Sequence, residues 1–261
     1  MTSSIQPTRD PATQYVLRLG DTCLILAQRL SEWCGHAPIL EEDIALTNMA
    51  LDLIGQSRGL LTLAGQMNQR AGGQALHEDQ LAFLRDERDY LNPTLVELPR
   101  GDFAFTVLRN AMVATYLTLM WAKLADSSEP ELAAIAGKAV KESRYHQQHA
   151  ADWVLRLGDG SEESARRLRV ALDSLWRFST ELFVCDAIDE TAAATGIGPR
   201  ASELREPWLA SMTALLADAG LVLPTATAFV SHGKQGVHSE AMGPLLSNLQ
   251  HLQRAYPGGV W

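Results

Sequence analysis

The chain has 261 residues, of which 46% are hydrophobic, and it carries a formal net charge of −9. This length allows one large domain, and a domain of this size buries roughly 70–75% of its unfolded surface without a disulfide or metal staple. The acidic balance argues against non-specific binding to nucleic acid or to an anionic membrane surface, because both need clustered Lys and Arg.

The cysteines and the N-terminal residues indicate a cytoplasmic protein. Cys23, Cys34 and Cys185 form no C-x-x-C pair, which fits a reducing compartment and neither a disulfide framework nor a zinc ribbon. Residues 1–12 are polar and lack the apolar core of a signal peptide. No uninterrupted apolar run approaches the length of a membrane span. We therefore expect a flexible tail over residues 1–12 and a single domain over residues 13–261.

Helical periodicity runs through nearly all of the chain after Thr13. Acidic residues at several expected helix starts support this interpretation, because the helix dipole favours negative charge there. The expected helices span about residues 13–34, 39–69, 78–88, 102–125, 130–157, 161–194, 201–219 and 239–255.

Glycine and proline residues separate these helices, and Asp102 has the character of an N-cap. The best candidate for a strand covers residues 222–230, and Pro224 weakens it. Long helices joined by short connections favour antiparallel packing. The sequence therefore predicts an all-α helical bundle with additional helices.

Two of the long helices have the spacing of a metal site without its ligands. Four-helix carboxylate bundles hold two irons with one Glu from each of two helices and a Glu-x-x-His from each of the other two. The spacing matters because residues three apart lie on one helix face. Here Leu53 and Gln56 occupy the two positions on the second helix, and Ser143 and His146 occupy them on the fifth. Leucine cannot bind a metal, and glutamine offers only a weak neutral oxygen.

The other two long helices lack their carboxylates as well. The first has no acid between Asp21 and Glu32, and the fourth has none between Asp102 and Asp126. One imidazole cannot neutralise a hard, oxygen-rich iron pair. We therefore predict that this chain holds no di-iron site, and we interpret His146 as a hydrogen-bonded core residue.

Acidic residues on the sixth predicted helix leave an alternative open. Glu181, Asp186, Asp189 and Glu190 could form a carboxylate cluster, although we favour an exposed or interface face. In the alternative, the chain is an independent metalloenzyme that uses His146 with Glu181 or Asp186.

No common enzyme motif appears: the sequence lacks a nucleophile elbow, a Walker loop, a Rossmann glycine motif and an H-E-x-x-H helix. His232, His238 and Glu240 form a polar group before the last helix, and we favour a capping or interface role for them. A further alternative is a binding module for coenzyme A esters that works without enzymatic partners.

Six stretches together make this sequence resemble one family, the C-type subunits of the bacterial ring-1,2-phenylacetyl-CoA epoxidases (PaaC). The resemblance covers about residues 13–261. The stretches are Leu17-Arg18-Leu19-Gly20-Asp21, Ser31-Glu32-Trp33-Cys34-Gly35-His36-Ala37-Pro38, Leu84-Arg85-Asp86-Glu87-Arg88, Lys141-Glu142-x-Arg144-Tyr145-His146, Leu175-Trp176-Arg177-Phe178 and Gly236-x-His238-x-Glu240.

This resemblance implies a ferritin-like fold and a place in a heteromer. In that family the chain pairs with a homologous catalytic subunit that holds the di-iron ligands. A small bridging subunit and a reductase with flavin, an iron–sulfur cluster and NADPH complete the enzyme, which epoxidises the aromatic ring of phenylacetyl-CoA with oxygen. The chain itself would be a non-catalytic structural subunit with no cofactor of its own.

The resemblance also implies substrate contacts at two segments. An irregular segment suits this role, because a Tyr and an Asn there could hold a polar ligand such as a coenzyme A chain. The implied residues are Asp89, Tyr90, Leu91 and Asn92 in the first segment and Glu190, Thr191 and Ala192 in the second.

Overall fold

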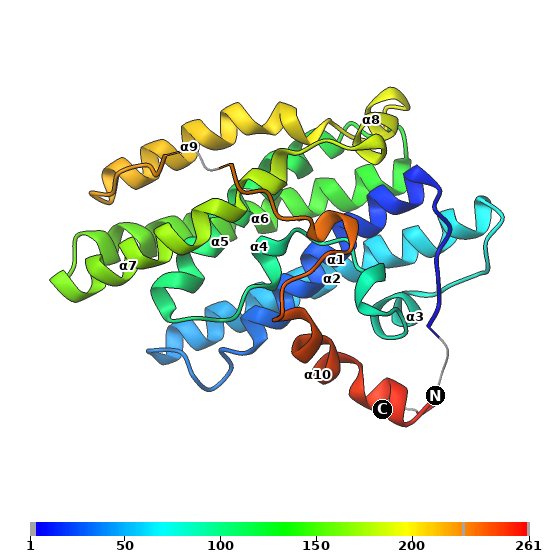
Figure 1. Cartoon of the computed structure of the whole chain (residues 1–261), viewed down its shortest axis with the longest axis horizontal. Helices are drawn as coiled ribbons and strands as arrows, with labels where there is room; N and C mark the ends of the chain where they lie inside the picture. The colour runs from blue at the N-terminus through cyan, green and yellow to red at the C-terminus, as the bar shows by residue number, and fades with distance from the viewer. Residues whose placement is uncertain (1–3, 226–227, 260–261) are drawn as a thin grey trace.

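Two helical hairpins form the centre of the molecule. The computed structural model describes residues 4–225 and 228–259. One hairpin joins α1 (Pro11–Ser31) to α2 (Leu40–Arg70), and the other joins α5 (Phe103–Leu124) to α6 (Pro130–Gly158) (Figure 1). Within the described residues there is no β-strand, only an isolated bridge between His232 and Val237. The predicted all-α class is confirmed, and the arrangement is consistent with a ferritin-like bundle.

Shorter helices surround this core. In Figure 1, α9 lies along one edge of the bundle and α10 lies at the opposite edge. Short 3₁₀ turns at Glu87–Asp89, Trp176–Phe178, Thr180–Phe183, Ala201–Leu204 and Gly233–Gln235 lie in the connections. The outer helices are α3 (Glu78–Phe83), α4 (Thr94–Glu97), α7 (Glu162–Leu175), α8 (Ala187–Ala194), α9 (Arg205–Asp218) and α10 (Met242–Ala255).

The four long helices begin and end within three residues of their predicted bounds. Asp102 caps α5 as expected, because its carboxylate accepts the N–H of Phe105 at 2.9 Å. Pro130 occupies the first turn of α6, where its missing N–H costs nothing.

The predicted continuous helix over residues 161–194 is wrong. After α7 the chain forms two 3₁₀ turns and an extended stretch, and α8 starts anew. Asp186 caps α8 by accepting the N–H groups of Ile188 and Asp189 at 3.0 and 3.2 Å. An aspartate that accepts backbone N–H groups favours a new helix start over a continuous helix. The 3.6-residue periodicity of apolar residues does not reveal such a start.

The predicted flexible tail is partly ordered against the domain. The N–H of Thr8 donates to the side chain of Asn68 at 2.6 Å, and the N–H of Ile5 donates to the carbonyl of Leu84 at 3.2 Å. Pro11 already begins α1, and Asp10 caps it. Residues 1–3 of the predicted tail lie outside the described residues.

Helix α5 has the length and mean hydropathy of a membrane span, although Arg109 and Asn110 interrupt its apolar run. Among the described helices it alone is long and apolar enough to cross a membrane by length and composition, and 78% of its most apolar window is buried inside the domain. A central bundle helix buried on all sides has this composition.

A buried ion pair ties α1 to the segment that follows α3. Asp21 and Arg85 have fully buried side chains and pair through two hydrogen bonds. Asp21 also accepts the N–H of Leu91 at 2.9 Å, while Arg85 donates to the carbonyls of Leu81 and Asp89. The charges are therefore well satisfied, which a buried pair needs if it is not to destabilise the fold.

Removing one member of this pair should destabilise the protein strongly. Asp21→Asn leaves the Arg85 guanidinium buried without a countercharge, so the free energy of unfolding should fall by about 3–5 kcal/mol. Urea unfolding followed by circular dichroism measures the change. The matched control is Arg58→Met, because Arg58 is exposed and pairs with Glu78 at 3.4 Å, and a change of at most about 1 kcal/mol is expected there. Equal losses in the two variants would contradict this account.

Candidate functional site

The structure places the four motif positions on α2 and α6, two long helices that pack against each other. Leu53 and Gln56 come from α2, and Ser143 and His146 come from α6; all four are buried.

Hydrogen bonds between side chains hold His146 and Gln56. The imidazole of His146 lies 3.1 Å from the carboxylate of Asp52, and the amide nitrogen of Gln56 donates to Glu142 at 2.9 Å. Further along the helices, the imidazole of His149 lies 2.8 Å from Glu42. We call these three cross-helix bonds the α2–α6 ladder. The interpretation of His146 as a hydrogen-bonded core residue is confirmed.

The donor set of the ladder does not fit a di-iron centre. Leu53 has no donor atom, and the hydroxyl of Ser143 is buried without a hydrogen-bond partner. Burial lowers the pKa of His146, and the bond to Asp52 offsets this only in part. Across residues 4–225 and 228–259, no group of three or more His, Cys, Asp or Glu side chains could hold a metal ion.

A second buried polar cluster joins α4 to the segment before α10. Glu97 and His238 have fully buried side chains, and the Nδ1 of His238 lies 2.6 Å from the Glu97 carboxylate. The Nε2 of the same ring lies 2.9 Å from the carbonyl oxygen of Tyr90. Glu97 also accepts the side-chain amide of Asn92 and the N–H of Ser239.

This geometry requires a charged imidazole at position 238. Both ring nitrogens face oxygens that only accept hydrogen bonds, so both must carry a proton. Burial alone would lower the pKa of His238, but the hydrogen bond to Glu97 and its negative charge outweigh burial and raise that pKa. His238 and Glu97 thus form a buried ion pair. Of the polar group predicted before the last helix, only His238 has this structural role, because His232 and Glu240 are exposed.

Two further buried carboxylates hold the same segment, residues 231–239, which we call the crossing segment. Glu181 accepts the hydroxyl of Ser231 at 2.6 Å and the N–H of Lys234 at 2.8 Å, as well as the N–H of Thr94 at 2.9 Å. The ammonium of Lys234 lies 3.5 Å from Asp189. In Figure 1 the crossing segment passes over the bundle between α9 and α10.

The expectation of an exposed face for the acids of residues 181–190 is therefore wrong for two of them. Glu181 is 1% exposed and Asp189 is 2% exposed. Asp186 pairs with Arg18 at 2.7 Å, and Glu190 remains exposed in a pair with Arg200. The break between α7 and α8 turns Glu181 inward, which a continuous helix would not have done.

The residues implied as substrate contacts do not all lie at one site: some line a surface pocket, and others are buried in the core. Asp89 and Leu91 line a pocket of about 280 Å³, together with the neighbouring Arg88 and with Arg9 and other residues near the N-terminus. Ile188 of α8 lines the same pocket, so the first segment and the helix that carries Glu190, Thr191 and Ala192 approach one another there.

Tyr90 and Asn92 point away from that pocket into the core. The phenol of Tyr90 donates to the carbonyl of Ala82 and accepts from Gln250, and burial raises its pKa to about 12. Asn92 is fully buried and bonded to Glu97. These two residues therefore hold the segment in place rather than present a surface to a ligand.

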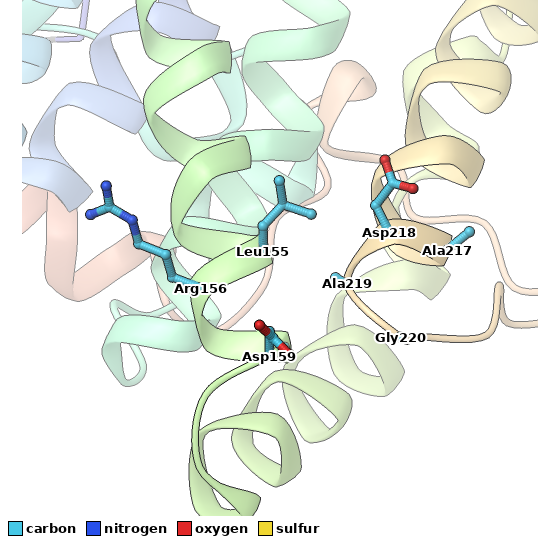
Figure 2. Close-up of a pocket in the computed structure, with 8 residues that line it drawn as sticks. Leu155, Arg156, Asp159, Ala217, Asp218, Ala219 and Gly220 are labelled. Carbon is cyan, nitrogen blue, oxygen red and sulfur yellow. The ribbon is translucent and has the colours of Figure 1, made fainter.

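A separate hollow of about 910 Å³ lies where α6 and α9 end. Figure 2 shows Leu155 and Asp159 at the end of α6 on one side and residues 217–220 at the end of α9 on the other. Both helices direct their negative ends toward it. None of the predicted site residues lines this hollow, so it is not the candidate site.

Comparison with known proteins identifies the family. A family model described as "Phenylacetic acid catabolic protein" matches residues 1–261. This chain belongs to that family. It is 45% identical over 249 residues to a protein of Escherichia coli (strain K12) that is named as the C subunit of 1,2-phenylacetyl-CoA epoxidase, and the match covers 95% of this chain and 98% of the relative. The resemblance inferred from the sequence is confirmed.

Several buried charges of this family member could not be predicted from the sequence. Glu97 lies between two prolines, and Arg85 lies in a charged run that is typical of a solvated surface. Asp21 had a visible signal, because it is a lone acid inside the apolar stretch from Leu17 to Ala27. An acid in such a place needs a buried partner, but the sequence does not name the partner.

His238 and His146 should give opposite pH dependences of stability. The raised pKa of His238 means that its contribution is complete below its unfolded value of about 6.5 and is lost as the pH rises through the folded pKa. The lowered pKa of His146 means that its contribution is complete above about 6.5 and is lost as the pH falls toward the folded pKa.

The free energy of unfolding, measured by urea titration across this range, tests both statements. His238→Gln should flatten the slope on the alkaline side, and His146→Gln should flatten it on the acid side. The exposed His251→Gln serves as the control and should change neither slope. If His238→Gln keeps the wild-type slope on the alkaline side, the raised pKa of His238 is refuted. If His146→Gln keeps it on the acid side, the lowered pKa of His146 is refuted.

Proposed function

We propose that this chain is the C-type subunit of a phenylacetyl-CoA epoxidase and that it has a structural, non-catalytic role. The observation that carries the proposal is a combination: the chain is 45% identical to a relative with that name, and its two motif positions for carboxylate ligands hold Leu53 and Ser143. A helical scaffold that keeps the shape of an oxygenase without its ligands suits the support of a catalytic relative.

The proposed partners follow from the same assignment. A homologous catalytic subunit would hold the di-iron centre, and a small bridging subunit and a reductase with flavin, an iron–sulfur cluster and NADPH would complete a cytoplasmic enzyme. The name of the relative, as one lettered subunit of an epoxidase, supports the existence of further subunits. Phenylacetyl-CoA is the proposed substrate of the assembly.

The independent metalloenzyme is the weaker candidate. It would need His146 to act with Glu181 or Asp186. His146 is held by Asp52, while Glu181 accepts hydrogen bonds from three groups of other segments. Metal analysis of the purified chain separates the two candidates, because stoichiometric, tightly bound iron would overturn the structural role.

The pocket beside Asp89 is the proposed contact with the coenzyme A part of the substrate. Arg9 and Arg88 line it and are exposed, and neither pairs with a carboxylate among the described residues. A guanidinium offers paired donors that match a phosphate oxygen. The pocket is therefore suited to a phosphate group of the coenzyme, with Leu91 and Ile188 supplying an apolar wall.

Omission of this chain should impair the catalytic subunit. We expect the catalytic subunit expressed alone to be less soluble and less active than the same subunit expressed together with this chain, because its subunit interface would be exposed. Soluble yield and epoxidation rate with a saturating reductase measure the effect. A catalytic subunit that is fully soluble and active alone would refute the structural role.

Substitution of the pocket arginines should weaken substrate binding in the assembled enzyme. Each of Arg9→Ala and Arg88→Ala removes a charge-assisted contact, so KM for phenylacetyl-CoA should rise about tenfold. The turnover number should stay near its wild-type value, because the proposed reaction takes place in the catalytic subunit and not in this chain. Arg166→Ala on α7 is the matched control, since Arg166 is exposed and pairs with Glu163. An unchanged KM in both pocket variants would remove this site.

A further inference from the structure

Residues 4–10 form part of the lining of the pocket beside Asp89. We call these residues the N-terminal arm; in Figure 1 it is the dark blue stretch that runs from the start of α1 past the end of α3. Gln6, Pro7 and Arg9 of the arm line the pocket, and Gln14 of α1 lines it as well. The rest of the lining comes from the segment after α3 and from α8. The arm thus supplies part of the proposed contact with coenzyme A.

Side chains of the first two helices hold both main-chain groups of Thr8. Its N–H donates to Oδ1 of Asn68 at 2.6 Å, and its carbonyl oxygen accepts from Nε2 of Gln14 at 2.6 Å. Asn68 lies on α2 and is 1% exposed, and its own amide nitrogen donates to the carbonyl oxygen of Gln74 at 2.8 Å. The backbone of the arm is therefore fixed directly before Arg9.

The start of the arm is attached to the segment after α3. The N–H of Ile5 donates to the carbonyl oxygen of Leu84 at 3.2 Å. The hydroxyl of Ser4 accepts the N–H of Asp86 at 3.0 Å and lies 3.4 Å from the carboxylate of Asp89, to which it donates. The arm is therefore held both before and after its first two pocket-lining residues.

The charges of the pocket lining favour an anionic ligand. Arg9 and Arg88 contribute two positive charges, and Asp89 contributes one negative charge. The carboxylate of Asp89 accepts the hydroxyl of Ser4. The two guanidinium groups offer paired donors that match the oxygens of a phosphate.

An arm that is already held makes Arg9 a better contact than an arginine on a free segment. Ordering a free segment costs conformational entropy at every residue, and this cost reduces the free energy of binding. Here the bonds at Thr8 and Ile5 order the backbone when the protein folds. Pro7 restricts the arm further, because its ring fixes φ. Binding then has to order only the side chain of Arg9.

We propose that the N-terminal arm is a built part of the coenzyme A site and that Asn68 is a positioning residue, which holds Arg9 at the pocket through the backbone of Thr8. This inference rests on the proposed function. Asn68 is not among the residues that line the pocket, so its effect on binding passes through the arm. The arm recognises a phosphate of the coenzyme and not the acyl group, so free coenzyme A binds there as the ester does.

Loss of the acceptor on Asn68 should weaken binding without changing turnover. In the assembled enzyme, Asn68→Ala should raise KM for phenylacetyl-CoA about fivefold, because it removes a hydrogen bond that holds the backbone beside Arg9. The turnover number should stay near its wild-type value. The dissociation constant of free coenzyme A, measured by isothermal titration calorimetry, should rise by the same factor as KM. Asn248→Ala on the exposed side of α10 is the matched control and should change none of these quantities.

Two further variants separate the arm from the loop at Gln74. Asn68→Asp keeps an oxygen for the N–H of Thr8 but loses the donor to the Gln74 carbonyl, so its KM should stay near the wild-type value. Thr8→Pro removes the N–H of the arm and leaves Asn68 in place, so it should raise KM as Asn68→Ala does. This second variant also decides the matter if Asn68→Ala does not fold.

A double-mutant cycle tests the route through Arg9. Because Asn68 acts on binding through Arg9, Asn68→Ala should raise KM no further when Arg9→Ala is already present. Independent effects of the two substitutions, which multiply in KM, would overturn the positioning role. An Asn68→Asp variant that is as impaired as Asn68→Ala would overturn it too, because the loop at Gln74 would then carry the effect.

The outcomes separate this proposal from the proposed function. If Arg9→Ala and Arg88→Ala both leave KM unchanged, the coenzyme A contact is wrong, and the role of the arm is wrong with it. If these two variants raise KM while Asn68→Ala and Thr8→Pro do not, the contact stands and the positioning role alone is overturned.

Discussion

The contact between α2 and α6 is the interaction on which the rest of this structure depends. It joins the two helical hairpins, and its inner side is where a carboxylate-bundle protein would bind metal. Here Asp52, Glu142 and Glu42 reach across to partners on the opposite helix or accept from them, and Leu53 fills the remaining space. These three hydrogen bonds join α2 to α6, and with them the two hairpins.

Buried carboxylates organise the connections around that bundle. Asp21, Glu97 and Glu181 each accept hydrogen bonds from backbone groups far away in the sequence. A buried carboxylate without donors would cost several kcal/mol, so each one fixes the course of the irregular chain that supplies its donors. This requirement fixes the positions of the crossing segment and of the segment around Leu91. The pocket proposed for coenzyme A lies beside the segment around Leu91.

The helices that could be predicted are those whose periodicity is continuous. The four long helices and the cap at Asp102 followed from apolar spacing and helix-end chemistry. The break between α7 and α8 could not be predicted, because α7 ends at Leu175 and Asp186 caps the start of α8 without a glycine or proline between them. Its consequence, the burial of Glu181, was therefore missed as well.

The sequence by itself determined the helical class and the family, because periodicity and residue identity at fixed spacing are local properties of the chain. Only the tertiary structure decided which residues partner His146 and Gln56 and which charges are buried. Asp52 meets His146 across 94 positions, and Glu97 meets His238 across 141. Such pairs form because a buried charge needs a partner, and the fold alone decides which distant residue lies within reach.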